Sequence, residues 1–322
     1  MMKRRSEWSQ TLEADETREL LRAAREACAG ALEGEQEQGE SCADGGHPAR
    51  AARRLAALPL IRNRSRRWRR ELMERSGVTL IRGVPAGDMS PSERAAVFLA
   101  IGRNIGHAVS QNASGHLLGH VYDLGGEMKA ERRLYTTNLA QPFHTDSSDV
   151  VGLMCIRQAR AGGESSVVSS SQIFNEVLRI DERLARVLTE PFLNDRKGEA
   201  DAGQLPYFAM PVFMFHEGKL LSMYDRTFID AAQERFADQL PRLTDEQVAA
   251  LDLCDELCTR DDLRIDMDLM PGDIQLLHNH NTWHARSAYS DHSDGRKRHL
   301  LRYVLQPQLF HFLERLDMLV NE

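Results

Sequence analysis

Three short segments, far apart in the sequence, carry side chains that could bind a metal ion and an anion. The first is Phe143-His-Thr-Asp146, which comes directly before an apolar run. Residues at positions i and i+2 of an extended strand point to the same side, so His144 and Asp146 could bind one metal ion. This pair alone is a weak signal, because chance produces many such pairs.

The second segment, residues 271–284, reads as a Pro-Gly-Asp turn, an apolar strand and then a loop rich in histidine. Two histidines and one carboxylate on one face of a metal ion leave three positions open. This is the ligand arrangement of non-haem Fe(II) oxygenases. His278, His280 and His284 compete for the place of the second histidine. The residue types alone do not choose among them.

The third segment, residues 296–302, opens the last strand with several basic side chains. Arg298 and Arg302 are four residues apart and therefore share one face of that strand. Arginine binds a carboxylate through two parallel hydrogen bonds. A pair of surface arginines on an edge strand is the simpler interpretation of these two residues alone. Beside a metal site, the same pair predicts a pocket for anionic small molecules.

Together with a fourth motif, these segments resemble the taurine dioxygenase-like branch of the Fe(II)/2-oxoglutarate-dependent oxygenases, to which clavaminate synthase is also similar. The shared motifs, in order, are His-x-Asp at 144–146, Gly-Gly-acid-Ser at 162–165, Asn-x4-His at 279–284 and Arg-x3-Arg at 298–302. The position of Asn279 selects His284 over the two neighbouring histidines, and His284 precedes Arg298 by 14 residues. The resemblance extends over about residues 78–306.

The resemblance implies a role for each matched residue. It implies that the iron ligands are His144, Asp146 and His284. It also implies that Arg298 and Ser165 bind the distal carboxylate of 2-oxoglutarate, and that Arg302 meets an anionic group of the prime substrate. Because halogenases of this class lack the carboxylate ligand, Asp146 implies oxygenation rather than halogenation.

Four further side chains are weaker candidates for contact with the substrate. Gln111 and Asn138 lie in segments that take part in the resemblance. Tyr224 and Arg226 precede an inserted helix that could cap the pocket. For the last two, an ordinary surface role is the alternative.

The implied activity is hydroxylation, or another oxidation, of a small molecule that is anionic or amino-acid-like. Fe(II) would be the cofactor and O2 and 2-oxoglutarate the cosubstrates, with release of succinate and CO2. Two other classes remain open: a 2-oxoglutarate-independent metalloenzyme, and a non-catalytic small-molecule-binding protein on the same fold. The first would not need Arg298 and Ser165, and the second need not keep the metal triad together with both arginines.

The elements that must position these residues indicate an α+β fold. Many short strand-like runs with few helices between them are typical of a barrel or jelly roll. The resemblance implies a double-stranded β-helix core, which is jelly-roll and cupin-like, with an N-terminal helical layer. We expect residues 1–76 to form a helical, Arg-rich segment packing on the core, and residues 77–322 to form the oxygenase domain. Helices should be inserted at about 171–190 and 227–258, and capping boxes begin helices after Ser90 and Thr244.

Composition restricts the partners. The chain has 322 residues and a formal net charge of −7, which argues against general binding to nucleic acid or to anionic membranes. The arginines of residues 50–70 could suggest nucleic acid, but a solvated helix face is the simpler interpretation. Five cysteines, an odd number, argue against a disulfide scaffold, so a cytoplasmic location is expected. We expect a small-molecule substrate and leave a homo-oligomer open.

Overall fold

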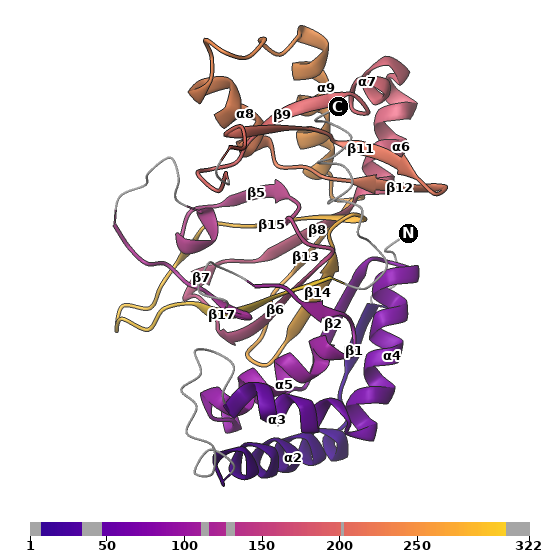
Figure 1. The fold of residues 1–322 in the computed structure, drawn as a ribbon. Helices are drawn as coiled ribbons and strands as arrows, with labels where there is room; N and C mark the ends of the chain where they lie inside the picture. Colours follow the sequence, from indigo (N-terminus) through magenta and orange to yellow (C-terminus); the bar gives the residue numbers. More distant parts are fainter. Residues whose placement is uncertain (1–7, 34–46, 111–115, 127–132, 201–202, 307–322) are drawn as a thin grey trace.

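The computed structural model describes residues 8–33, 47–110, 116–126, 133–200 and 203–306. Helices α2–α5 lie at one end of the molecule, β-sheets fill the middle, and helices α6–α9 lie with two hairpins at the other end (Figure 1). This mixture of helices and largely antiparallel sheets agrees with the fold content expected from the sequence. Within the described residues, no helix is both long enough and apolar enough to cross a membrane.

A seven-stranded sheet forms the larger β-structure. Its order is β1 (Ser9–Thr11), β2 (Val78–Arg82), β14 (Ile274–His278), β6 (Val150–Arg157), β17 (His299–Gln306) and β3 (His107–Ala108), and β4 (Leu118–Val121) also pairs with β17. Only the β1–β2 pair is parallel among the pairings described for this sheet. The central strands β2, β14 and β6 are covered on both faces, which explains their nearly continuous apolar sequences.

A four-stranded antiparallel sheet packs against the larger one. Its order is β13 (Arg264–Met267), β8 (Ser165–Ser169), β15 (Thr282–Arg286) and β5 (Gln141–His144). Leu80, Val151 and Leu277 of the large sheet share an apolar cluster with Val167 and Met267 of the small one. The short strands β7 (Ala161–Gly162) and β16 (Tyr289–Ser290) pair at the edge of this region. The two sheets therefore enclose a common interior.

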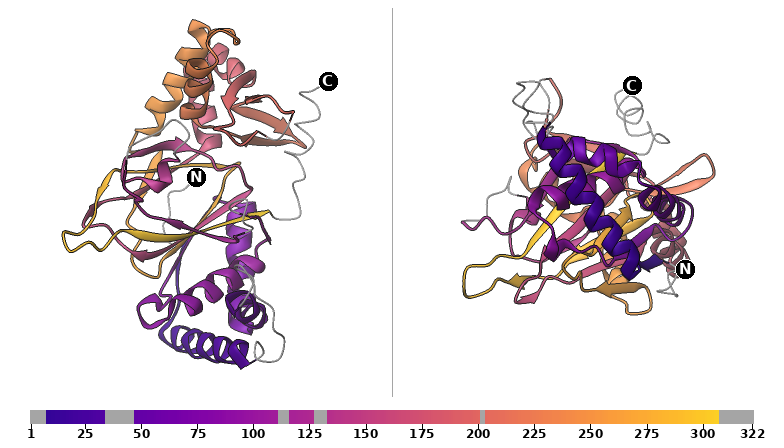
Figure 2. Two further views of the ribbon diagram at one scale, coloured as in Figure 1. Left: turned by 60° about the vertical axis from the view of Figure 1, so that its left-hand side comes forward. Right: turned by 90° about the horizontal axis from the view of Figure 1, so that it is seen from below.

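An N-terminal helical layer covers the other face of the large sheet (Figure 2). It consists of α2 (Ala14–Glu33), α3 (His47–Ala56), α4 (Pro59–Glu74) and α5 (Pro91–Arg103), with the short 3-10 helix η1 (Ala86–Asp88) between the last two. Leu55, Trp68 and Phe98 share one apolar cluster with Tyr303 of β17. The basic stretch at 50–70 is broken before Pro59, where a new helix begins, because proline suits the first helical turn. Its arginines mostly face solvent, as expected.

The second helical group lies beyond the small sheet. It contains α6 (Ser170–Ile180), α7 (Glu182–Val187), α8 (Arg226–Arg235) and α9 (Asp245–Cys258), with the hairpins β9 (Pro191–Asp195)–β10 (Tyr207–Pro211) and β11 (Phe213–His216)–β12 (Lys219–Ser222). The helix expected at 171–190 is two helices, because the Asp181 carboxylate accepts a hydrogen bond from Arg183 N and caps α7. The helix expected at 227–258 is likewise divided into α8 and α9. Both predicted capping boxes, at Ser90 and Thr244, are confirmed.

Close packing of α5 on β17 gives a stability prediction. An alanine Cβ at Gly102 would lie 2.0 Å from Cε1 of Tyr303, whose ring is 1% exposed and held edge-on against Phe98. Glycine to alanine in a helix usually gains up to about 1 kcal/mol, but overpacking costs about 1–3 kcal/mol. We therefore expect Gly102→Ala to lower the free energy of unfolding in urea titrations. Gly87→Ala is the control, since nothing lies within 4 Å of its Cβ. Equal stability of the two variants would contradict this packing.

Candidate active site

A pocket between the two sheets brings together six of the predicted site residues. Its polar lining consists of Gln141, His144, Asp146, Ser165, His284, Arg286, Arg298 and Arg302. Its remaining lining consists of Val121, Tyr135, Val151, Leu153, Leu269, Ala285 and Leu300. The small sheet supplies the histidines, and the large sheet supplies most of the apolar wall. The pocket therefore gathers the His-x-Asp, Ser165, His284 and arginine motifs at one place.

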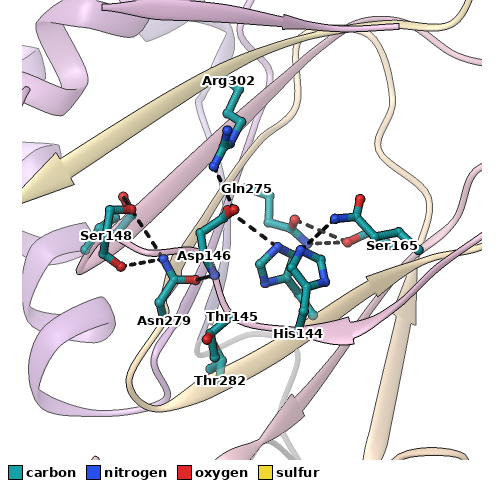
Figure 3. A network of polar contacts seen from close by, with 12 residues as sticks. His144, Thr145, Asp146, Ser148, Ser165, Gln275, Asn279, Thr282 and Arg302 are labelled. Atoms are coloured by element: carbon teal, nitrogen blue, oxygen red, sulfur yellow. Dashed lines mark hydrogen bonds and ion pairs between the residues drawn. The ribbon is translucent and has the colours of Figure 1, made fainter. Parts of the chain in front are cut away.

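The first two predicted ligands lie where β5 ends. His144 is the last residue of β5, and Asp146 follows beyond the strand instead of continuing it as the sequence suggested. The side chain of Asn279 holds this turn: its Oδ1 accepts a hydrogen bond from Asp146 N at 3.3 Å, and its Nδ2 donates to Ser148 O at 2.6 Å (Figure 3). The fixed position of Asn279 five residues before His284 therefore has a structural reason. It ties the second histidine segment to the first.

The third predicted ligand lies on a strand, not in the histidine-rich loop expected from the sequence. His284 is in β15, directly opposite His144 in the pairing with β5. Side chains directly opposite on antiparallel strands are neighbours. The two imidazole centroids are therefore 4.2 Å apart, and His284 Nε2 lies 3.7 Å from Asp146 Oδ2.

The protonation states suit metal binding. His144 Nδ1 donates to the carbonyl oxygen of Pro142 at 2.9 Å, which leaves a lone pair on Nε2, the atom that faces the Gln141 amide at 2.8 Å. Burial, together with the neighbouring His144, lowers the pKa of His284 to about 3. Burial alone would raise the pKa of Asp146, but the charge of Arg302 and the two histidines hold it below its usual value. His284 is thus neutral and Asp146 ionised at neutral pH, and both His144 and His284 offer an imidazole nitrogen.

These donors fit a divalent cation in type and charge, although they are not in ligand geometry. Across the described parts of the chain, no three His, Cys, Asp or Glu side chains are arranged to hold a metal ion. Two contacts explain this. The Gln141 amide faces Nε2 of His144, and Arg302 Nη2 binds Asp146 Oδ1 at 2.6 Å (Figure 3). The assignment of the three ligands stays a prediction, which the convergence of the side chains supports.

Arg298 provides a buried positive charge beside these residues. It is 5% exposed, its Nη2 donates to Gly163 O at 3.1 Å, and its Nη1 is buried without a hydrogen-bond partner. A Cβ on Gly163 would lie 2.8 Å from Arg298 Nε, so the glycine of the Gly-Gly-acid-Ser motif makes room for the guanidinium. The hydroxyl of Ser165 exchanges hydrogen bonds with the amide of Gln275. An unsatisfied, buried guanidinium N–H of this kind fits an anionic ligand.

Arg302 shares the pocket face with Arg298, as their spacing predicted. Its charge is already used, however, in the ion pair with Asp146, and its guanidinium also lies over the ring of Tyr135 at 5.3 Å. In this arrangement the Arg302 guanidinium is therefore occupied by Asp146, and it is not free to bind the substrate anion predicted for it.

The weaker candidates do not join the pocket. Tyr224 is buried against Trp283 and donates to Asp255, while Arg226 pairs with Asp230, Asp252 and Asp255. Neither side chain is in the pocket lining, because their polar groups are satisfied elsewhere, and their contact with a substrate stays a prediction. Asn138 is exposed and also absent from the lining, and Gln111 lies outside the described residues. His278 and His280 are buried away from the pocket, with His280 Nε2 2.9 Å from Asp149 Oδ1.

Two pocket residues were missed in the sequence. Gln141 and Arg286 both line the pocket, and they are opposite each other in the β5–β15 pairing. Arg286 could have been found, because it lies two residues after His284 and therefore on the same side of a strand. It was missed because that segment was interpreted as a loop.

The ligand assignment gives a prediction for metal binding. We expect Asp146→Ala and His284→Ala to lose binding of Fe(II), or of Co(II) as a substitute, in anaerobic titrations, because each removes one of three donors. His280→Ala should keep metal binding, although removing the partner of the buried Asp149 should lower stability. Tight metal binding by His284→Ala, with loss in His280→Ala, would show that the histidine is wrongly assigned.

Comparison with known proteins gives one family. Residues 47–304 match the family described as "Taurine catabolism dioxygenase TauD, TfdA family". FR-33289 synthase of Streptomyces rubellomurinus (strain ATCC 31215) is 34% identical over 232 residues, which cover 70% of this chain and 68% of that protein. Taurine hydroxylase-like protein SAT17 of Stachybotrys chartarum (strain CBS 109288 / IBT 7711) is 28% identical over 257 residues, 77% of this chain and 65% of that protein.

Solved structures show the same fold. An asparagine oxygenase in complex with Fe(II), 2S,3S-3-hydroxyasparagine and succinate is similar with a TM-score of 0.70, at 18% identity, over 93% of this chain and 94% of that one. The non-heme iron oxygenase OrfP in complex with Fe and alpha-ketoglutaric acid gives a TM-score of 0.67, at 16% identity, over 94% and 95%. The chain therefore belongs to the TauD, TfdA family of dioxygenases.

Proposed function

We propose that this dioxygenase hydroxylates a small anionic or amino-acid-like molecule, with His144, Asp146 and His284 as the iron ligands. The main observation behind the proposal is that one pocket contains both a candidate metal-binding cluster and a buried cation. A cluster of two histidines and a carboxylate lies beside the buried guanidinium of Arg298, which has an unpaired N–H. The first feature suits Fe(II), and the second suits the free carboxylate of 2-oxoglutarate.

Each pocket residue has a distinct task in this proposal. When bound, Fe(II) and 2-oxoglutarate supply the oxidising chemistry, with O2 consumed and succinate and CO2 formed. His144 offers Nε2 once the Gln141 amide moves away, and the Pro142 carbonyl keeps its ring oriented. Arg298 and Ser165 hold the far end of the cosubstrate. The apolar wall around Val151, Leu153 and Leu300 excludes water from the reacting centre.

The substrate class is inferred from charge and from related proteins. Three arginines reach this pocket, and Asp146 is the single carboxylate among the described residues of its lining. The similar solved structures hold hydroxyasparagine and, for OrfP, (3S)-hydroxy-L-Arg. An amino acid, a sulfonate or another carboxylate fits such a pocket. Arg302 could hold the substrate anion after its pair with Asp146 is shared or released.

We also infer the organisation of the chain. The two packed sheets are consistent with a double-stranded β-helix, and residues 77–322 would form the oxygenase domain around it. The N-terminal segment 1–76 would be a covering layer, since α2–α4 contribute to the apolar cluster under the large sheet. Because the family match begins at residue 47, α3 and α4 belong to the shared fold and are not an addition to it.

A direct experiment separates this function from the two alternatives. Anaerobic addition of Fe(II) and 2-oxoglutarate should produce a weak visible charge-transfer band, and succinate should form with one member of a panel of amino acids, sulfonates and carboxylates. A 2-oxoglutarate-independent metalloenzyme would bind metal without the band. A non-catalytic binding protein would release no succinate with any compound.

The role of Arg298 gives a quantitative prediction. Arg298→Ala should raise the KM for 2-oxoglutarate roughly tenfold to more than a hundredfold, because a charge-assisted contact contributes about 1.5–3 kcal/mol. Arg298→Lys should restore the affinity for 2-oxoglutarate only in part, since lysine lacks the planar guanidinium that forms two parallel hydrogen bonds. The result against us would be an unchanged KM in Arg298→Ala, with Arg302→Ala carrying the whole effect.

A further inference from the structure

A second guanidinium in the pocket lacks an anionic partner. Arg286 is 8% exposed and lines the pocket. Its Nη2 donates to the carbonyl oxygens of Thr137 and Leu139, so the side chain is held in place. Its Nε and Nη1 atoms are buried and have no hydrogen-bond partner. A fixed, buried cation with two unused donors is unfavourable unless a ligand supplies the acceptors.

The location of Arg286 indicates which ligand group it faces. In the pairing of β15 with β8, Arg286 is directly opposite Ser165. Residues paired in this way have neighbouring side chains on the same face of the sheet. Arg286 and Arg298 both line this pocket, and their guanidinium carbons lie over the Tyr289 ring, at 5.0 and 5.2 Å from its centroid. Arg286 thus lies at the Ser165–Arg298 end of the pocket.

The acidic groups near this end do not pair with its orphaned donors. Arg286 keeps its positive charge, because a guanidinium is not deprotonated in proteins. The carboxylates of Asp123 and Asp291 lie near Arg286 and Arg298, respectively, but accept no hydrogen bond from these donors. The carboxylate of Asp146 is paired with Arg302, and Glu164 accepts a hydrogen bond from Ser287. The orphaned donors at this end are Nε and Nη1 of Arg286, Nη1 of Arg298 and the hydroxyl of Tyr289.

We propose that Arg286 is a second arginine for the terminal carboxylate of the cosubstrate, acting together with Arg298. This inference rests on the proposed function, because it presumes that 2-oxoglutarate occupies the pocket. Its consequence is selectivity: two guanidiniums favour a 2-oxo acid whose far end is ionised over one whose far end is apolar. The 2-oxo acid group that faces the metal-binding end is the same in both kinds of acid. The difference in affinity should therefore come from the far end alone.

Calorimetric titration of the anaerobic Fe(II)-loaded protein tests the proposal without knowledge of the prime substrate. The two ligands are 2-oxoglutarate and 2-oxovalerate, which have the same chain length but end in a carboxylate and a methyl group. Arg286→Gln should weaken 2-oxoglutarate binding tenfold or more and change 2-oxovalerate binding less than about twofold. Arg286→Lys should recover part of the loss, because it keeps the charge without the fork.

The control is Arg296→Gln, which removes an exposed arginine that pairs with Asp294 and should bind both acids like the unaltered protein. A purely structural role for Arg286, through Thr137 and Leu139, would weaken both acids equally, and that result would overturn the proposal. An unchanged affinity for 2-oxoglutarate would also overturn it. If Arg286→Gln does not fold, the same selective loss, in smaller measure, is expected of Arg286→Lys. Failure of the unaltered protein to bind 2-oxoglutarate would instead overturn the proposed function, and this inference with it.

Discussion

The register of β15 between β5 and β8 is the constraint on which the pocket depends. On one side it sets His284 opposite His144, and on the other it sets Arg286 opposite Ser165. Because side chains alternate along a strand, His284 and Arg286 point to the same side, two positions apart. A slip by one residue would turn both away from the pocket. One strand therefore fixes the distance between the metal-binding end and the anion-binding end.

Asn279 positions Asp146, which lies outside any strand, relative to the two histidines that the strand register places opposite each other. Because Asp146 lies beyond the strand, its backbone N–H needs another acceptor, and the Asn279 amide provides it and also donates to Ser148 O. The amide is fully buried, where an unsatisfied polar group would be costly. The same side chain thus satisfies the turn and orients the carboxylate toward the two imidazoles.

The sequence predicted the chemistry of the site better than its local geometry. The resemblance carried by the four ordered motifs predicted the grouping of His144, Asp146, His284 and Arg298, which line one pocket. The sequence analysis did not place His284 in a strand, although Thr282–Arg286 alternates polar and apolar residues, because the whole histidine-rich segment was interpreted as a loop. Its polar residues face a pocket instead of solvent, and Arg286 was missed for the same reason.

Other expected positions differ from the structure for other physical reasons. Tyr224 and Arg226 have residue types suited to substrate binding, but their partners, Asp255 and its neighbours, come from a helix some thirty residues later in the chain. The break at Asp181 reflects competition between a side-chain cap and the continuing helix, which apolar periodicity does not resolve. Tertiary contacts decide such cases, and a single sequence does not reveal them.

The polar contacts of the pocket imply that metal binding is an exchange of partners. Arg302 satisfies Asp146 and the Gln141 amide faces His144 Nε2, so neither predicted ligand is an uncompensated buried group. A cation entering this cluster must displace the amide from His144 and share or replace the charge of Arg302. The net affinity is then the gain from coordination minus the loss of these contacts. The anion-binding end differs, because the unused N–H groups of Arg286 and Arg298 have no hydrogen-bond acceptor within the protein. A carboxylate that binds there forms new hydrogen bonds without displacing existing ones.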